Sequence, residues 1–144
     1  MLSCHFFCPL PPPIHGASIL AEDLMNFLEV KGTPTNFHSA HGGAFLVIRR
    51  MLNVLRSITR TDYRIAIVFT ASAFPGRLRD SFLVMLLLLA KKKVVIVSHN
   101  NPFFSRSILG AINLRLAKFC TTIFSYPSQE FSLLKANNYD ARVI

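Results

Sequence analysis

Cysteine is scarce in this sequence of 144 residues, and its spacing argues against a disulfide-stapled fold. Only Cys4, Cys8 and Cys120 occur. An odd number without the spacing of a disulfide framework predicts a reducing compartment. Cys4, His5 and Cys8 lie together, but no second pair of ligands stands at zinc spacing. We therefore expect a buried strand there, with two small thiol side chains.

Long apolar runs are also missing, and no secretory leader is expected. The most apolar run, Phe82–Ala90, has nine residues, whereas a helix needs roughly 20 to span a bilayer. We interpret this run as the apolar part of a core helix, with a surface-seeking helix as the weaker alternative. The N-terminus has no basic region, and Pro11-Pro12-Pro13 interrupts its apolar residues, so no secretory signal is predicted.

Several common enzyme motifs are absent. The chain has only six glycines, and they do not form the G-x-G-x-x-G fingerprint of a dinucleotide-binding site. A P-loop, a G-x-S-x-G nucleophile elbow and a zinc-hydrolase motif are missing as well. The five histidines and three cysteines do not assemble into a catalytic triad from spacing alone. The commonest NAD, nucleoside-triphosphate and hydrolase chemistries are thus disfavoured.

Acidic residues are few, and the resulting positive charge is concentrated in the middle of the chain. Seven Asp and Glu oppose sixteen Lys and Arg, which gives a formal net charge of +9. Residues 49–118 hold thirteen of the basic residues against only Asp62 and Asp80. This distribution favours an anionic partner: a membrane surface, a phosphate-bearing ligand or a nucleic acid.

Short apolar runs alternate with helical patterns. Strands are predicted at 3–8, 35–38, 64–70, 94–97, 121–126 and 142–144. Helices are predicted at 18–30, 44–60, 80–91, 105–119 and 128–137. This order predicts an α/β fold in which a parallel sheet carries helices on both faces. Ligands of such a sheet bind beyond the carboxyl ends of its strands.

Some local details can be checked directly. The helix at 18–30 has one apolar face, which comprises Leu20, Ala21, Leu24, Phe27 and Leu28. Residues 71–79 contain Pro75-Gly76 and are predicted to form a loop. Ser128 is expected to cap the last helix. The helix at 44–60 is amphipathic, and its basic face consists of Arg49, Arg50, Arg56 and Arg60.

The segment between the first strand and the first helix has a distinctive order, Pro11-Pro12-Pro13-Ile14-His15-Gly16-Ala17-Ser18. Its single glycine lets the backbone approach a ligand, and the following helix offers free N–H groups to a phosphate. This P-P-P-x-H-G-x-S segment resembles the start of family 4 glycosyltransferases of the GT-B fold, especially bacterial members that build surface polysaccharides. The resemblance continues in order through three later segments, Val97-Ser98-His99-Asn100, Tyr126-Pro127-Ser128 and Arg142-Val143-Ile144.

The resemblance implies that residues 1–144 form the N-terminal, acceptor-side domain of a retaining transferase, with a Rossmann-like sheet. A second domain, which binds the nucleotide-sugar donor through a pair of glutamates, has no place in these residues. The chain alone is therefore expected to be inactive. No metal or other cofactor is expected. The acceptor would be a glycan or a polyprenyl-phosphate-linked sugar, and the location cytoplasmic or peripheral on the cytoplasmic face of the membrane.

Specific residues acquire roles through the same resemblance. His99 is the candidate catalytic residue, and with Asn100 and Ser128 it would contact the transferred sugar or the acceptor. The loop that approaches the donor diphosphate comprises Pro13, His15, Gly16, Ala17 and Ser18. The basic face at Arg49, Arg50, Arg56 and Arg60 would contact anionic lipid headgroups; a solvated face is the alternative.

Two other functions stay open at this point. A non-catalytic, membrane-associated partner subunit would share the fold and the basic face without needing His15 or His99. A nucleic-acid-binding module would suit the charge. However, no known reader motif is present, and aromatic residues do not interleave with the basic ones. Nucleic acid is therefore not expected as a partner.

Overall fold

The computed structural model describes residues 4–8, 16–33, 35–39, 52–53, 55–56, 58, 63–71, 74–98, 103–104, 107–125 and 127–143. Its strands are β1 (Cys4–Cys8), β2 (Thr35–Ser39), β3 (Ile65–Phe69), β4 (Lys93–Ser98), β5 (Thr121–Phe124) and β6 (Ala141–Val143). Its helices are α1 (Gly16–Val30), α3 (Phe74–Leu89), α4 (Ile108–Ala117) and α5 (Gln129–Ala136). Between β2 and β3, the described residues 52–53, 55–56 and 58 are helical.

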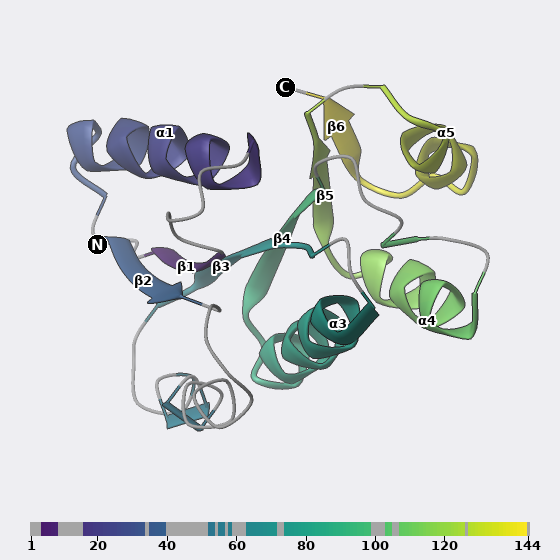
Figure 1. Cartoon of the computed structure of the whole chain (residues 1–144), viewed down its shortest axis with the longest axis horizontal. Helices are drawn as coiled ribbons and strands as arrows, with labels where there is room; N and C mark the ends of the chain where they lie inside the picture. The colour runs from purple at the N-terminus through teal and green to yellow at the C-terminus, as the bar shows by residue number, and fades with distance from the viewer. Residues whose placement is uncertain are drawn as a thin grey trace.

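The six strands form one parallel sheet in the order β2-β1-β3-β4-β5-β6 (Figure 1). Strand β1 pairs with β2 on one side and with β3 on the other, so the chain changes direction across the sheet between β1 and β3. From β3 onward each strand is added beside the previous one. The α/β, Rossmann-like parallel sheet expected from the sequence is confirmed, with helices on both faces.

Two apolar cores lie on opposite faces of this sheet. Successive strand residues alternate between faces, and in β3 Ala66 and Val68 belong to one core while Ile67 and Phe69 belong to the other. The first core also contains buried residues of α3, α4 and α5. The second core contains residues of α1, which lies across the sheet from α3 (Figure 1).

Helix α1 buries most of the predicted face, with one exception. Ala21 is buried, and Leu20, Leu24 and Leu28 pack against the same core. Phe27 is exposed, and the Lys31 Nζ atom lies 5.7 Å from the centroid of its ring. Phe27 therefore does not share the burial of the other four residues of this face. Gly32, with φ +69°, follows the helix in the left-handed conformation that glycine adopts without strain.

The start of α3 corrects another prediction. Residues 71–79 were expected to form a loop, but the helix begins at Phe74 and includes Pro75 and Gly76. Proline is tolerated in a first helical turn, where its missing N–H has no intrahelical partner. Gly76 packs so closely on Ala71 that an added Cβ would stand 2.5 Å from the Ala71 Cβ atom. Pro75 and Gly76, which suggested a loop, are thus compatible with a helix that starts close to Ala71.

The apolar run in α3 is only partly core. Leu83, Val84 and Leu87 are buried, as the core interpretation predicted, whereas Phe82 and Leu89 are exposed. A run that is apolar on every side of a helix must expose some of these residues when only one side meets the sheet. None of the helices within the described ranges has the length and apolarity needed to cross a membrane.

Candidate functional site

The carboxyl ends of the parallel strands form the edge at which ligands of such sheets bind. Helices α1, α3, α4 and α5 begin on this side because each follows a strand that ends there. The change of chain direction between β1 and β3 lies between the starts of α1 and α3. We call this side the carboxyl edge and take its described residues as the candidate site.

The end of β3 is held by a buried carboxylate from α3. The Asp80 Oδ2 atom accepts a hydrogen bond from the Ala71 N–H at 2.7 Å. Its Oδ1 atom accepts another from the Arg79 Nε at 2.8 Å, and the Arg79 guanidinium forms an ion pair with the same oxygen. Burial raises the pKa of Asp80, and the Arg79 charge and the two hydrogen bonds partly offset that rise. Asp80 therefore fixes the first residues of the loop after β3.

The loop after β4 is held in the same manner from the other side. The Glu130 Oε1 atom, on α5, accepts a hydrogen bond from the Phe104 N–H at 3.1 Å. The Asn113 Nδ2 atom, on α4, donates to the Phe103 carbonyl oxygen at 2.8 Å, and Asn113 is fully buried. Two helices thus anchor the far end of the loop that begins after Ser98.

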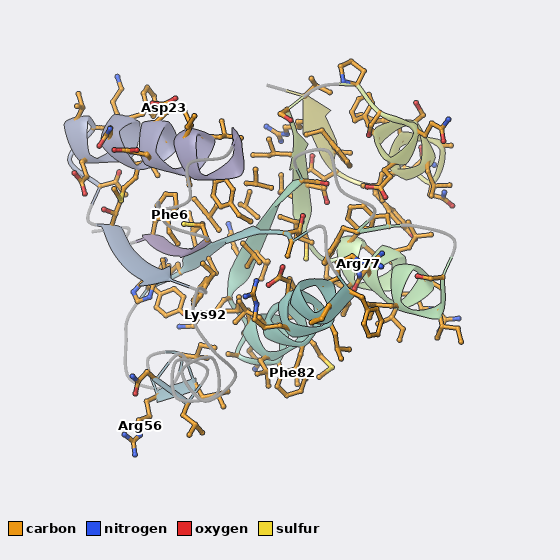
Figure 2. The ribbon with its side chains drawn as sticks, viewed as in Figure 1. Phe6, Asp23, Arg56, Arg77, Phe82 and Lys92 are labelled. Atoms are coloured by element: carbon orange, nitrogen blue, oxygen red, sulfur yellow. The ribbon has the colours of Figure 1, made fainter. Side chains whose placement is uncertain are left out.

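Arg77, near the start of α3, acts electrostatically on Glu130. Burial raises the pKa of Glu130, while the Phe104 N–H and the positive charge of Arg77 act in the opposite direction. Figure 2 shows Arg77 beside the first turn of α3, on the side of α4. The β3 and β4 ends are also joined directly, because Thr70 donates its N–H and its hydroxyl to the Val97 carbonyl oxygen. Hydrogen bonds from α3, α4 and α5 thus fix the backbone at several points of the carboxyl edge.

The polar groups of this edge hold the loops in position. The carboxylates of Asp80 and Glu130 already accept backbone hydrogen bonds, so they orient loops rather than stand ready to transfer protons. The beginnings of the helices supply N–H groups that suit an anion. Within the described residues, no group of three or more His, Cys, Asp or Glu could hold a metal ion. Cys4 and Cys8 are buried in β1, as expected, and burial raises the pKa of Cys8 to about 12.

The predicted loop residues lie only partly within the described chain. Gly16, Ala17 and Ser18 form the first turn of α1, so this helix starts two residues earlier than predicted. Pro13, His15, His99 and Asn100 lie outside the described residues. The roles predicted for them stay predictions.

Ser128 and the arginine face have partial descriptions. Ser128 caps α5, as predicted, because its hydroxyl accepts a hydrogen bond from the Phe131 N–H at 3.1 Å. Arg56 is exposed, and Figure 2 shows its side chain directed away from the sheet. Arg49, Arg50 and Arg60 lie outside the described residues. An exposed Arg56 is compatible with both the headgroup and the solvated interpretation.

Sequence reasoning did not identify Asp80 and Asn113 as organisers of this edge. Each is a polar residue inside an apolar helix, with leucine, valine, isoleucine or phenylalanine close by, and both are buried. A single Asp or Asn at the core-facing side of such a helix was the available signal, because buried polar groups need partners. Their partners, the backbone of two loops, do not follow from the helix sequences.

Comparison of the chain with protein-family models, with curated proteins and with solved structures found no match.

Proposed function

We propose that this chain is the acceptor-side domain of a retaining glycosyltransferase that uses a nucleotide-sugar donor and a glycan or polyprenyl-phosphate-linked acceptor. The observation that carries the proposal is the position of the P-P-P-x-H-G-x-S segment. In the sequence it lies between β1 and α1, and its glycine, Gly16, is the first residue of α1. This place, next to the change of direction in the sheet, is where α/β folds bind phosphate groups.

The anchored loops support the same proposal. A transferase must hold its acceptor loops in one geometry, because a misplaced reactive group loses most of the rate advantage of proximity. Asp80 fixes the loop after β3 and Glu130 fixes the loop after β4. In the proposed enzyme, His15 contributes a hydrogen bond or a positive charge to the leaving diphosphate. His99 orients the transferred sugar or the acceptor.

Binding of a short acceptor analogue to the chain tests this proposal. The probe is geranyl phosphate, titrated into isotopically labelled protein, with inorganic phosphate and geraniol as separate controls. We expect saturable amide shifts at Gly16, Ala71 and Phe104, all at the carboxyl edge. Shifts confined to Gly32 and Lys91 at the opposite edge, or none at all, would overturn the proposed acceptor site.

A further inference from the structure

Helix α3 presents a row of large apolar side chains to solvent. Its members follow one another at spacings of three and four residues, which places them along one side of the helix. We call this row the α3 stripe; its residues are Phe74, Leu78, Phe82, Met85 and Leu89, each 38% to 72% exposed. The same helix buries the polar residues Asp80 and Ser81. Packing against the sheet therefore does not explain why the solvent-facing side of α3 is apolar.

Helix α4 exposes apolar side chains as well. It packs beside α3, and its exposed apolar residues also recur at helical spacing. They are Ile108, Ile112 and, two turns further, Phe119 just after the helix, each 45% to 87% exposed. Figure 2 shows Phe82 on the side of α3 that faces away from the sheet. Large exposed apolar areas are rare on monomeric proteins and usually mark an interaction surface.

The charges around this surface have one sign. Lys91 and Lys93 are exposed just beyond the C-terminal end of α3, and Arg115 and Lys118 are exposed on α4 and at its end. Asp80, the sole acidic residue of α3, is buried and paired with Arg79. Residues 81–129 contain no Asp or Glu. A partner that covers the α3 stripe thus meets positive charge beside apolar side chains.

We propose that the α3 stripe and the exposed apolar residues of α4 lie on the surface of an anionic lipid bilayer. Apolar side chains in a row, with Lys and Arg beside them, are the features of a helix that rests in the headgroup region. The stripe spans 16 residues, Phe74–Leu89, or roughly 24 Å at 1.5 Å per residue, which suits a helix lying flat on a membrane.

This membrane contact deepens the proposed function. It rests on that function only where the acceptor is taken to be lipid-linked. Phe74 is at the start of α3, next to the loop that Asp80 holds. A bilayer along the stripe therefore lies close to the carboxyl edge, where a polyprenyl-phosphate-linked acceptor would enter. Arg56 belongs to the same side of the sheet, because Ile58, from the same helical segment, packs in the core with Leu83. The headgroup contact predicted for Arg56 agrees with this orientation.

Flotation of the whole chain with lipid vesicles tests the inference. One set of vesicles contains phosphatidylcholine alone, and the other contains phosphatidylcholine with phosphatidylglycerol; neither contains an acceptor lipid. We expect the chain to float with the anionic vesicles and to float less as salt increases. The double variant Leu78→Gln/Phe82→Gln should bind about tenfold more weakly, because two partly buried apolar contacts are lost.

Two further variants keep the result interpretable. Phe27→Gln, on α1, removes a comparably exposed phenylalanine from the opposite face and should leave vesicle affinity within about twofold of the original. Arg115→Gln/Lys118→Gln should weaken binding to anionic vesicles about tenfold. All three variants alter exposed positions, so unchanged circular dichroism and urea unfolding are expected and are measured first.

The outcomes separate this inference from its rivals. It is overturned if the chain does not float, or if the α3 variant floats as well as the original. An equal loss of vesicle binding in Phe27→Gln also contradicts it. So does a dimer, seen by light scattering, that Leu78→Gln/Phe82→Gln breaks, because the α3 stripe would then be a contact between two copies of the chain. Because no acceptor is present, failure here leaves the geranyl phosphate experiment as an independent test of the proposed function.

Discussion

Two carboxyl groups at the carboxyl edge accept hydrogen bonds from backbone N–H groups. Asp80 accepts from Ala71, and Glu130 accepts from Phe104. Removing a buried acceptor leaves its donor without a partner, at a typical cost of about 1–3 kcal/mol. Asp80 and Glu130 therefore position these loops, and their ionisation should be visible in the stability of the fold.

The pH dependence of stability tests the environment of Glu130. Burial raises its folded-state pKa above the ordinary value of 4.5, so the folded chain binds this proton more tightly than the unfolded chain does. This contribution to stability is present at low pH and is lost as the pH rises through the folded-state pKa. Glu130→Gln abolishes the titration and retains a carbonyl acceptor for Phe104.

We therefore expect the free energy of unfolding of the original chain, relative to Glu130→Gln, to fall from about pH 4 toward neutrality. Urea unfolding of both proteins across this range measures the difference. The pKa of Asp80 is raised as well, but Asp80 is present in both proteins, so its contribution to the difference cancels. A difference that grows with pH would show that the carboxylate, not the acid, is favoured in the fold.

Tyr63 provides a second test at the scale of single residues. Its ring stacks on His5 at 3.7 Å between centroids, and the Lys92 Nζ atom lies 4.3 Å from its centroid. Its hydroxyl is buried, without a hydrogen-bond partner among the described residues, and burial raises its pKa to about 12. The ring, rather than the hydroxyl, should supply the stabilisation.

Tyr63→Phe should accordingly leave the free energy of unfolding unchanged or raise it by up to about 1 kcal/mol. Tyr63→Leu should lower it by about 1–3 kcal/mol, because it removes the stack and the cation–π contact. Urea unfolding of the three proteins decides between these roles. A large loss in Tyr63→Phe would mean that the hydroxyl is hydrogen-bonded.

At the scale of elements, the close start of α3 depends on Gly76. An alanine there would bring its Cβ to 2.5 Å from the Ala71 Cβ, a distance that forces the backbone to move. Gly76→Ala should destabilise the chain by about 1–3 kcal/mol. The other atoms near the added Cβ stand at 3.9 Å or beyond, so Ala71 is the obstacle.

The double variant Ala71→Gly/Gly76→Ala is the matched control. It removes the obstructing Cβ, and we expect it to be more stable than the sum of the two single changes predicts. Thermal and urea unfolding of all four proteins complete the cycle. Strictly additive losses would contradict a direct Ala71–Gly76 contact.

Most elements follow from the sequence because their apolar patterns are strong and short. The β-branched runs at β3 and β4 predict buried strands, and the structure places them there. The N-terminal boundary of α3 does not follow, since Pro75-Gly76 is as typical of a turn as of a tight first helical turn. The exposed row on α3 does not follow either. An apolar run contains no information about which of its sides meets the sheet.

At the scale of the molecule, the parallel sheet is predictable because strand–helix alternation permits few other arrangements. The described helices are distributed unevenly, with α1 on one face and α3, α4 and α5 on the other. The candidate site is less predictable. Loop position indicates the carboxyl edge, but the contacts of Asp80 and Glu130 join segments that only the folded sheet brings together.

A transfer assay tests the proposed role of this fold in sugar transfer. The chain would be purified from its native source together with any protein that it binds there. The preparation would then be supplied with labelled nucleotide-sugars and membrane lipids. We predict label in the lipid or glycan fraction with the anomeric configuration of the donor. His15→Ala or His99→Ala should reduce the rate about tenfold or more, whereas Glu22→Ala, on the exposed side of α1, should not. No transfer from any donor, or unchanged rates in both histidine variants, would contradict the account.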